Sequence, residues 1–501
     1  MKKIIPYIIW TIVATLWATL CFIAPDFADN PVHSFRTAAV ITGYVIALGG
    51  ATFFILYLAG LSRYIAAVFL PVFGILGAIV SYFRVAFHST ITPMVVDVTL
   101  HTNGGEIASV VTWQLITWLL VNILIICILL WWRWHISVNK PWGHAIVILL
   151  LWGVYYFGHS RLHMSTNQRY PYNVVVSLVE YAKQRQAIQA ERLSLPAYAE
   201  ALPDSIDVIF VLGEAVRADH LSLNGYSRQT CPRLAQQSNI LSLPNTYSPY
   251  TYTSLSVPYI LSPADSLHSG WTNTYYSFIH TFHRHGFYTA WLSNQDKGRN
   301  YVAFIHESDT IIFPNASKTS FVFDPWYDEQ LLTPLDSLMQ HATARNLYVF
   351  HMIGSHWYYN NHVTPQHQLF QPVTTERIIT RNESQHIINS YDNTILYLDM
   401  FLDSIIQRFE GRNAIMLYLS DHGEALGEDG QWLHANDAQP LHHPAALVWY
   451  SDRYAASFPD KIHALHQNAS RRFRTEYLYP SILSAAGLEI DSLSSDMNIF
   501  N

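Results

Sequence analysis

The stretch "NAIMLYLSDHG", residues 413–423, is an apolar run that ends in the polar pair Asp421 and His422. Three further runs share its β-rich character: "IDVIFVL" (206–212), "FYTAWLS" (287–293) and "RNLYVFHMIG" (345–354). Helical patterns separate these runs, for example over residues 384–410. Continuous apolar strands that alternate with helices predict an α/β domain with a mostly parallel central sheet and helices on both of its faces.

Polar side chains stand where these predicted strands end. Glu214 follows the run at 206–212, and Asp421 and His422 end the run at 413–423. Sites in α/β folds gather beyond the carboxyl ends of the strands, so these residues predict a zinc or manganese site. Taken singly, such a glutamate is typical of a helix cap or a surface charge, and such a histidine of a hydrogen-bonded structural residue. Further candidate ligands are His351, His356, His434, His442 and His443.

The stretch "YTYTSLSVP", residues 250–258, carries the aliphatic hydroxyl groups of Thr251, Thr253, Ser254 and Ser256. A run of this kind is typical of a turn or a helix cap. Pro258 is tolerated only near a helix start, which predicts a helix that begins within residues 253–261. Beside a metal ion one of these hydroxyls could act as a nucleophile, because the metal lowers its pKa and neutralises a phosphoryl oxygen. A Ser-His-Asp esterase is disfavoured, since the sequence has no G-x-S-x-G motif.

The first third of the chain is strongly apolar. Only 13% of all residues are charged, against roughly 25% in soluble domains, and the deficit is concentrated in five charge-free runs. These runs cover residues 4–25, 37–62, 64–83, 107–132 and 141–160. Each is about as long as the ~20 residues that a membrane-spanning helix needs, so we predict a membrane domain of five helices over residues 1–160. A cleaved signal peptide is the alternative interpretation of the first run.

Basic residues in the short loops predict the orientation of these spans. The basic residues on one side are Lys2, Lys3, Arg63, Arg133 and Lys140. The other side carries Arg36, few other basic residues and several acidic ones. By the positive-inside rule the N-terminus is cytoplasmic, and five crossings place the chain after about residue 160 outside the cytoplasm.

Residues 161–205 are predicted to connect the membrane domain to a second domain over residues 206–501. Apolar residues at spacings near three and four, among them Val175 and Leu178, predict an amphipathic helix in this connector. That helix lies either on the membrane surface or against the soluble domain. Cys231 is the single cysteine of the exported part, which excludes a disulfide within it, and a net charge of −7 argues against nucleic acid as a partner.

Several stretches, in their order and spacing, resemble the bacterial phosphoethanolamine transferases of the alkaline phosphatase–sulfatase superfamily, above all those that modify lipid A. The matching stretches are "VLGEAVRADHLSLNGYSRQTCPRL" (211–234), "YTYTSLSVPYILS" (250–262), "HMIGSHW" (351–357), "NSYDNTILYLD" (389–399) and "YLSDHGEALGEDGQWLHA" (418–435). The five predicted spans are similar to the anchor of that family, so the resemblance covers nearly the whole chain. It implies a multi-pass protein of the bacterial inner membrane with a periplasmic, sulfatase-like catalytic domain.

The resemblance also implies roles for particular residues. The zinc ligands that it implies are Glu214, Thr253, Asp421 and His422. It further implies that Thr253 is the nucleophile, and that His356 and His434 act in catalysis near the substrate phosphate or a second zinc. The residues that it implies in substrate binding are Lys297, Asn103, Glu106, His356 and His434, with Asn103 and Glu106 contacting the donor lipid.

The sequence departs from the family pattern in two places. Pro249 and Tyr259 stand where members that modify lipid A usually carry cysteines flanking the nucleophile. Val98 stands where the family often has asparagine, which bears on donor binding. The superfamily chemistry does not need the two cysteines, so their replacement bears on stability rather than on catalysis.

The activity implied by the resemblance is transfer of phosphoethanolamine from phosphatidylethanolamine to lipid A of lipopolysaccharide, through a covalent adduct on Thr253. Zinc is the expected cofactor, with a second zinc as an option and Mn²⁺ less favoured. The protein is expected to be a monomer among membrane lipids. By lowering the negative charge of lipid A it would confer resistance to cationic peptides such as polymyxin. The alternatives are transfer to core oligosaccharide, another glycan or a protein, a phosphoglycerol transferase of the same fold, and a non-catalytic membrane scaffold.

Overall fold

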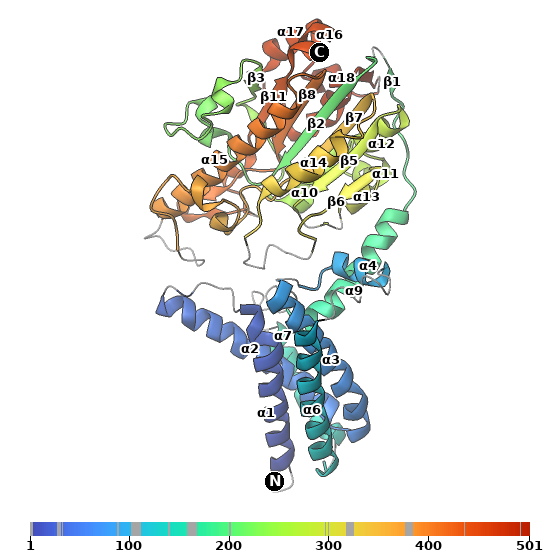
Figure 1. The fold of residues 1–501 in the computed structure, drawn as a ribbon, viewed down its shortest axis with the longest axis vertical. Helices are drawn as coiled ribbons and strands as arrows, with labels where there is room; N and C mark the ends of the chain where they lie inside the picture. The colour runs from blue at the N-terminus through green and yellow to red at the C-terminus, as the bar shows by residue number, and fades with distance from the viewer. Residues whose placement is uncertain are drawn as a thin grey trace. The chain divides into compact units, whose positions relative to one another are not determined.

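The computed structural model describes the chain except for residues 1–3, 28–31, 33, 88–89, 102–111, 139–140, 158–166, 168, 200–201, 296, 299, 317–324, 376–383, 435 and 491. The described residues form two compact units: the first lies within residues 1–182, and the second comprises residues 183–316 and 325–501. The division falls inside helix α9 (Tyr172–Gln189), within the predicted connector 161–205. Figure 1 shows the helices of the first unit and the central sheet of the second.

The first unit consists of helices. Their bounds are α1 (Ile5–Ala18), continued by a π-helical turn (Thr19–Ile23) and a 3₁₀ turn (Ala24–Phe27), α2 (Phe35–Gly60), α3 (Arg63–Phe87), α4 (Pro93–His101), α6 (Trp113–Trp134) and α7 (Pro141–Phe157). The described helical segments that are long and apolar enough to cross a membrane are Ile5–Phe27, Phe35–Gly60, Arg63–Ala86 and Trp113–Trp134. The fifth predicted span, 141–160, corresponds to α7, whose apolar part Trp142–Gly153 is shorter, so the number of five spans stays a prediction.

Helix α9 presents its apolar side chains outward. Val175 and Leu178, which belong to the predicted apolar face, are 63% and 49% exposed. The buried positions are polar instead: Asn173, Gln184, whose amide donates to the Lys297 carbonyl at 2.8 Å, and Ser177, whose hydroxyl donates to the Ile91 carbonyl. Val174 packs against the core of the first unit, whereas the exposed side chains of Val175 and Leu178 face away from the described protein, as expected of a helix that lies on the membrane surface.

The second unit is built on a seven-stranded sheet with the strand order β3-β11-β8-β2-β7-β5-β6. The four predicted strands are present as β2 (Ile206–Gly213), β5 (Tyr288–Ser293), β7 (Arg345–His351) and β8 (Ala414–Ser420). They run parallel, as does β6 (Thr310–Ile312) beside β5. At the opposite edge β11 (Ala446–Tyr450) pairs antiparallel with β8 and with β3 (Ile240–Ser242). The sheet is therefore mixed but mostly parallel, as predicted.

Short strand pairs and helices complete this unit. The pairs are β1 (Tyr198–Ala199) with β13 (Leu488–Glu489), β4 (Thr246–Tyr247) with β12 (Phe473–Arg474), and β9 (Ala425–Leu426) with β10 (Trp432–Leu433). The helices are α10 (Thr253–Leu261), α11 (Trp271–Thr274), α12 (Phe278–Arg284), α13 (Val302–Ile305), α14 (Leu332–Met339), α15 (Ser384–Phe409), α16 (Asp452–Ser457), α17 (Pro459–Asn468) and α18 (Leu478–Ala485).

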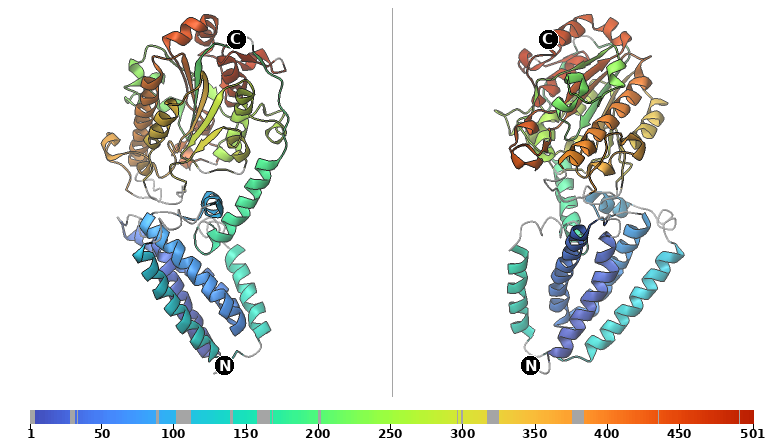
Figure 2. Two further views of the ribbon diagram at one scale, coloured as in Figure 1. Left: turned by 45° about the vertical axis from the view of Figure 1, so that its right-hand side comes forward. Right: turned by 90° about the vertical axis from the view of Figure 1, so that its left-hand side faces the viewer.

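Both faces of the sheet are covered, because every residue of β2 is buried and its apolar side chains alternate between two cores. Phe210 and Leu212 belong to one core, together with residues of α10, α12 and α18. Ile209 and Val211 belong to the other core, together with residues of α14 and α15. Figure 2 shows the sheet between these two layers of helices. This arrangement leaves the carboxyl ends of the parallel strands as the edge at which polar side chains can gather.

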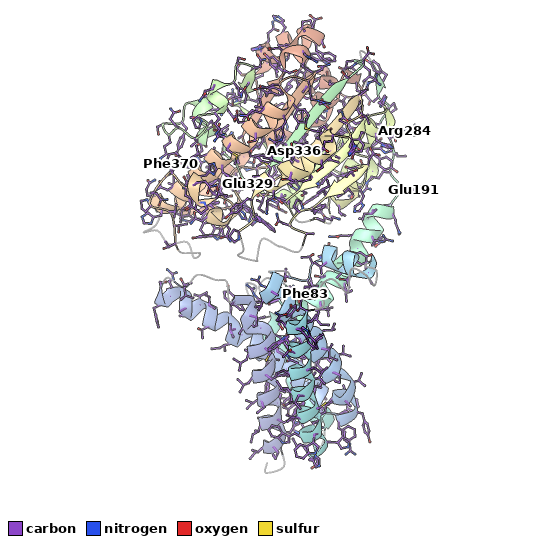
Figure 3. The ribbon with its side chains drawn as sticks, in the orientation of Figure 1. Phe83, Glu191, Arg284, Glu329, Asp336 and Phe370 are labelled. Carbon is purple, nitrogen blue, oxygen red and sulfur yellow. The ribbon has the colours of Figure 1, made fainter. Side chains whose placement is uncertain are left out.

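The two helices on the second face are also joined at their surface. Asp336 of α14, labelled in Figure 3, accepts a hydrogen bond of 2.6 Å from Nε of Arg408 on α15. Because this ion pair is open to solvent, it contributes at most about 1 kcal/mol, and burial of apolar side chains holds the layer in place.

Candidate active site

The carboxyl ends of two neighbouring strands bring three polar side chains together. Gly213 at the end of β2 pairs with Ser420 at the end of β8, so Glu214 follows one strand where Asp421 and His422 follow the other. The imidazole Nε2 of His422 lies 3.3 Å from Glu214 Oε1 and 3.4 Å from Asp421 Oδ2. All three side chains are fully buried.

Thr253 is the first residue of α10 and places its hydroxyl at this cluster. Its Oγ1 donates a hydrogen bond of 2.9 Å to Glu214 Oε2 and lies 3.5 Å from His422 Nε2. The predicted helix over 253–261 is thus confirmed. Thr253 is partly exposed, whereas Glu214 and His422 are buried, so a substrate can reach the hydroxyl while the polar cluster stays shielded.

Helix α10 contains Pro258 beyond its first turn, a position at which proline removes one backbone hydrogen bond. The carbonyl that loses its helical donor is that of Ser254, and the side-chain amide of Asn300 donates to it at 3.0 Å. Ser256, by contrast, is buried and donates to the Asp421 backbone carbonyl at 2.5 Å. Of the hydroxyls in this stretch, Thr253 therefore faces the carboxylates and Ser256 anchors the helix to the chain at Asp421.

His434 joins the same cluster. Glu214, His422 and His434 each offer a ligand atom, and these atoms lie within 4.8 Å of one another. The His434 Nδ1 lies 3.1 Å from the buried carboxylate of Glu424, whose other oxygen accepts a hydrogen bond of 2.8 Å from the Tyr359 hydroxyl. A carboxylate behind a histidine fixes the orientation of the ring, as it does behind the ligands of metal sites.

His356 lies beside His434, with their ring centroids 5.7 Å apart. Its Nδ1 donates to the Trp357 carbonyl at 2.6 Å, which leaves Nε2 for other partners. The ammonium of Lys297 lies over the ring of Phe313, 4.7 Å from its centroid, and its role in substrate binding stays a prediction. Asn103 and Glu106, predicted to bind the donor lipid, lie outside the described residues.

The other candidate histidines are not part of the cluster. His351 is buried, and its ring centroid lies 5.6 Å from those of Trp291 and Tyr301. His442 donates from Nδ1 to the Ser248 carbonyl at 2.8 Å. His351 packs in the core, and the structure gives His442 a hydrogen-bonding role.

The cluster fits a metal ion by its unsatisfied oxygens. Within the described part of the chain, Glu214 Oε1 and Asp421 Oδ2 are buried and accept no well-aligned hydrogen bond, with only His422 Nε2 shared between them at 3.3 and 3.4 Å. Two such oxygens are costly unless a cation completes them, and carboxylate oxygens with imidazole nitrogens are ligands that zinc prefers. The described residues that present these atoms are Glu214, Asp421, His422 and His434, with the Thr253 hydroxyl beside them.

The shifted pKa values of Asp421 and His422 also indicate that positive charge stabilises the cluster. Burial, followed by the charge of Glu214, raises the pKa of Asp421 to about 7. Burial opposes protonation of His422, but the carboxylates of Asp421 and Glu214 outweigh it and raise its pKa to about 10. Without a metal ion, the imidazolium of His422 thus supplies positive charge to the two carboxylates, and a cation held by the deprotonated ring would take over that role.

Several residues of the site escaped prediction. The Gln295 side-chain amide donates to Glu214 Oε2 at 2.9 Å, and its only signal was its position two residues after β5. Glu424 stands two residues beyond His422, and its only signal was that closeness to the Asp421-His422 pair. Tyr391 lies on α15, and nothing in the local sequence links it to Glu214.

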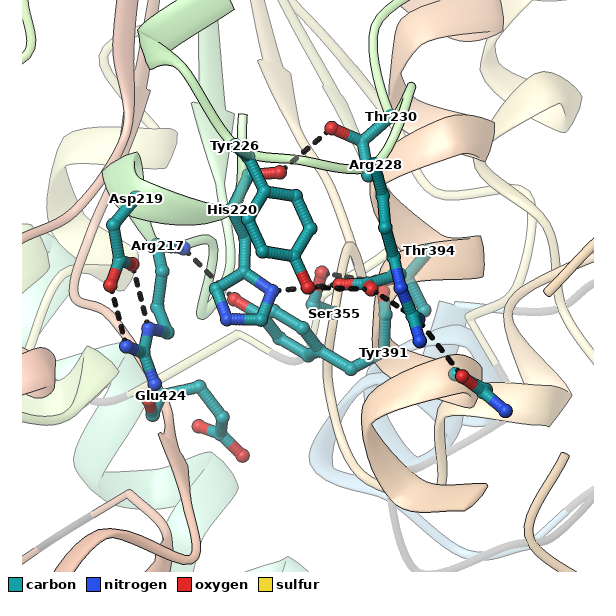
Figure 4. A network of polar contacts seen from close by, with 12 residues as sticks. Arg217, Asp219, His220, Tyr226, Arg228, Thr230, Ser355, Tyr391, Thr394 and Glu424 are labelled. Carbon is teal, nitrogen blue, oxygen red and sulfur yellow. Dashed lines mark hydrogen bonds and ion pairs between the residues drawn. The ribbon is translucent and has the colours of Figure 1, made fainter. Parts of the chain in front are cut away.

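Tyr391 holds the chain immediately after Glu214. Ala215 has a φ of +59°, which non-glycine residues rarely adopt. The Tyr391 hydroxyl donates to the Ala215 carbonyl at 2.7 Å and accepts from the Arg217 amide at 2.9 Å. Figure 4 shows the second of these contacts, between Tyr391 and Arg217. The Ala215 amide in turn donates to Asp421 Oδ1 at 3.2 Å. This turn therefore couples the two carboxylates of the site to α15.

Gly354 permits a second contact with the same strand end. Its φ is +51°, and a Cβ atom there would lie 2.9 Å from the Glu214 carbonyl oxygen. Only glycine fits this approach, after which the Ser355 amide donates to the same carbonyl at 3.0 Å.

Each of the two units is similar to known protein families. Residues 206–488 match the Sulfatase family model, and residues 50–186 match the model of Phosphoethanolamine transferase EptA/EptB. The chain is 26% identical to Phosphoethanolamine transferase EptA of Salmonella typhimurium, over 97% of this chain and 95% of that protein.

Two solved structures share its fold. The integral membrane protein lipooligosaccharide phosphoethanolamine transferase A from Neisseria meningitidis has a TM-score of 0.56 at 22% identity, covering 98% of this chain and 97% of that chain. The periplasmic domain of EptC from Escherichia coli, in complex with Zn, has a TM-score of 0.57 at 23% identity, covering 62% of this chain and 90% of that chain.

Proposed function

The chain belongs to the sulfatase family, and on this premise we propose that it transfers phosphoethanolamine from phosphatidylethanolamine to lipid A at the bacterial inner membrane. The observation that carries the proposal is the Thr253 hydroxyl, 2.9 Å from the carboxylate of Glu214 and next to His422. A hydroxyl in this position is a nucleophile beside a metal-binding set, which is the arrangement needed for phosphoryl transfer through a covalent intermediate.

Thr253 makes the first bond in this proposal. Its Oγ1 attacks the phosphorus of the donor, and the bond from phosphorus to the diacylglycerol oxygen breaks. The hydroxyl proton leaves along the hydrogen bond to Glu214, and a protonated His356 or His434 supplies the proton that diacylglycerol takes away. The product of this half-reaction is phosphoethanolamine on Thr253.

The second half-reaction reverses these roles. A phosphate oxygen of lipid A attacks the same phosphorus, and the bond to Thr253 Oγ1 breaks. The histidine that gave up its proton takes one from the acceptor, and Glu214 returns the proton of Thr253. Glu424 keeps His434 oriented through both steps, because its carboxylate lies 3.1 Å from His434 Nδ1.

Zinc held by Glu214, Asp421, His422 and the Thr253 hydroxyl would lower the pKa of that hydroxyl and neutralise the phosphoryl oxygens. We propose that this set of residues binds one zinc ion. His356 and His434 are proposed to bind the substrate phosphate, or a second zinc. The membrane helices, predicted with a cytoplasmic N-terminus and a periplasmic second unit, would keep the site at a bilayer that contains the donor lipid.

The direct test is the covalent adduct. The full chain is incubated with phosphatidylethanolamine, and intact-mass and peptide analysis should find phosphoethanolamine on Thr253. Thr253→Ala should remove both the adduct and the transfer, while Thr251→Ala, a threonine of the same stretch, should retain both. An adduct that persists in Thr253→Ala and vanishes in Thr251→Ala would refute the assignment.

The acceptor has its own test. Lipid A from cells with and without the active protein is compared by mass spectrometry, with Thr253→Ala as the inactive control. Added phosphoethanolamine on lipid A supports the proposal, together with weaker killing by polymyxin as the negative charge of lipid A falls. If lipid A is unchanged and phosphoethanolamine is found on core oligosaccharide, another glycan or a protein, lipid A is not the acceptor. The molecule that carries the added group would then be the acceptor.

A further inference from the structure

The membrane unit contains a cavity of about 620 Å³ at the end where α2 meets α3 and where α6 ends. Its walls come from the turn between α2 and α3, from the last residues of α6, and from Trp142 at the start of α7. Gly60 in this region packs on the ring of Trp10 near the start of α1. The cavity thus lies at the end of the helices where α1 begins.

The charged groups that line this cavity are cationic. Arg63 and Arg133 contribute to its wall, and among the described residues its lining contains no aspartate or glutamate. The Arg63 guanidinium lies 5.4 Å from the ring centroids of both Tyr64 and Trp134. Contact with ring faces leaves the in-plane N–H groups of a guanidinium available as donors, so Arg63 can still bind an anion.

Arg133 has a different role in the same wall. It is only 3% exposed and donates to three carbonyls: Gly60 at 2.5 Å, Ile136 at 2.7 Å and Leu61 at 3.0 Å. These bonds satisfy the carbonyls at the end of α2 and hold the loop after α6 against it. Arg133 therefore shapes the cavity and adds positive charge, while Arg63 is the side chain free to contact a ligand.

The start of α3 adds to the positive potential. This helix begins at Arg63 and runs for 25 residues, so its N-terminal amide groups and helix dipole face the turn that lines the cavity. Large aromatic side chains surround the opening, with Trp142 82% exposed, Tyr64 67% and Trp134 45%. Aromatic residues of this kind gather where a membrane helix meets the head groups of the bilayer.

We propose that this cavity binds the phosphate head group of an anionic glycerophospholipid, such as phosphatidylglycerol, in the leaflet at the N-terminal end of the helices. The phosphate lies at Arg63, and the acyl chains lie along apolar wall residues such as Leu58 and Ile65. An anionic lipid is favoured over phosphatidylethanolamine because the lining offers no carboxylate for an ethanolamine ammonium. By the predicted orientation this is the cytoplasmic leaflet, and the inference does not rest on the proposed transferase activity.

Native mass spectrometry of the full chain in detergent tests the proposal. The protein is titrated with phosphatidylglycerol or with phosphatidylethanolamine of the same acyl chains, and the lipid-bound fractions are compared. Phosphatidylglycerol should be retained at least about fivefold better, and Arg63→Gln should weaken its retention about fivefold, as expected for the loss of one basic contact. Arg63→Lys, which keeps the charge, should lie between the two.

The matched control is Arg36→Gln, because Arg36 is an exposed arginine in the first turn of α2, at the other end of that helix. It should leave lipid retention unchanged. Equal retention of the two lipids by the unmodified chain would overturn the proposal, as would equal loss in Arg63→Gln and Arg36→Gln. Inorganic phosphate that displaces phosphatidylglycerol completely would also overturn it, since the cavity would then be a phosphate site rather than a lipid site.

Discussion

Two buried clusters in the second unit contain the same kinds of side chain and differ in how completely they are paired. Around Asp392, one carboxylate oxygen contacts His220 at 2.7 Å, and the other accepts from Tyr226 at 2.9 Å and Arg228 at 2.7 Å. Figure 4 shows the side chains of His220, Tyr226 and Arg228 close to one another. At the strand ends, Glu214 and Asp421 each keep one buried oxygen that accepts no hydrogen bond from the described residues.

This difference in pairing indicates a structural role for the Asp392 cluster and a metal-binding role for the cluster of Glu214 and Asp421. Asp392 is neutralised by protein groups, so its cluster can fix the loop after β2 to α15 without any ligand. Glu214 and Asp421 share the single Nε2 of His422, at 3.3 and 3.4 Å, so their oxygens are less completely paired than those of Asp392, which is the condition expected of a site that a cation completes. Glu307 shows a third solution: one oxygen accepts from the Ser277 amide and hydroxyl, and the other has no hydrogen bond among the described residues.

Asp421→Asn should give the largest effect. It removes one charged oxygen of the unpaired cluster, so bound zinc should be lost and transfer should fall on the order of 10³-fold. In the presence of a chelator, however, the free energy of unfolding should not decrease, because a buried like charge beside Glu214 has been removed. Metal analysis, transfer assays and denaturant unfolding measure the three quantities. If the variant keeps its zinc, the incompletely paired carboxylates of Glu214 and Asp421 do not form a metal site that differs from the Asp392 cluster.

Asp392→Ala should have the opposite profile. It leaves Arg228 and the buried His220 without their carboxylate, so the free energy of unfolding should fall by about 3 kcal/mol. The content of bound zinc should not change. Denaturant unfolding with metal analysis checks this, and Asp336→Ala is the control, because the exposed pair with Arg408 should contribute less than about 1 kcal/mol. Loss of zinc in folded Asp392→Ala would show that the cluster is not purely structural.

The buried carboxyl group of Glu307 should make the free energy of unfolding depend on pH. Burial raises the pKa of this carboxyl to about 7 from an ordinary value of 4.5. Between these values the folded state holds a proton that the unfolded state has released, so the free energy of unfolding should fall as the pH rises through this window, by about 3 kcal/mol. Glu307→Gln should flatten that slope, while Glu410→Gln at an exposed position should not. Parallel slopes for all three chains would contradict the assignment.

Tyr391→Phe should give the smallest effect, because it removes one hydroxyl that supports the metal-binding turn. Zinc affinity and transfer should each fall about tenfold, the range seen when a group behind a metal ligand is lost. Tyr454→Phe is the matched control, since its buried hydroxyl also donates to a carbonyl, that of Ala485 at 2.7 Å, away from the site. It should lower stability without lowering zinc affinity. Equal zinc affinity in the two variants would remove Tyr391 from the site.

Much of the site could be predicted because it stands at strand ends. A parallel sheet aligns its carboxyl ends, so Glu214, Asp421 and His422 could be placed together from three local patterns. Thr253 could be singled out only by its resemblance to a family, since four hydroxyls share its stretch. In the structure the choice follows from the start of α10, which points the Thr253 hydroxyl to Glu214 and the Ser256 hydroxyl to the Asp421 backbone.

By itself, the sequence determined what depends on neighbouring residues: the apolar membrane helices, the four central strands, the start of α10 and the polar residues at the strand ends. Tertiary structure alone decided that β11 runs against β8, that Glu424 stands behind His434, and that Tyr391 holds the turn after Glu214. The physical reason is separation along the chain. Helix and strand periodicity is local, whereas the Tyr391 hydroxyl meets a carbonyl 176 residues away, and only the packing of α15 on the sheet selects that contact.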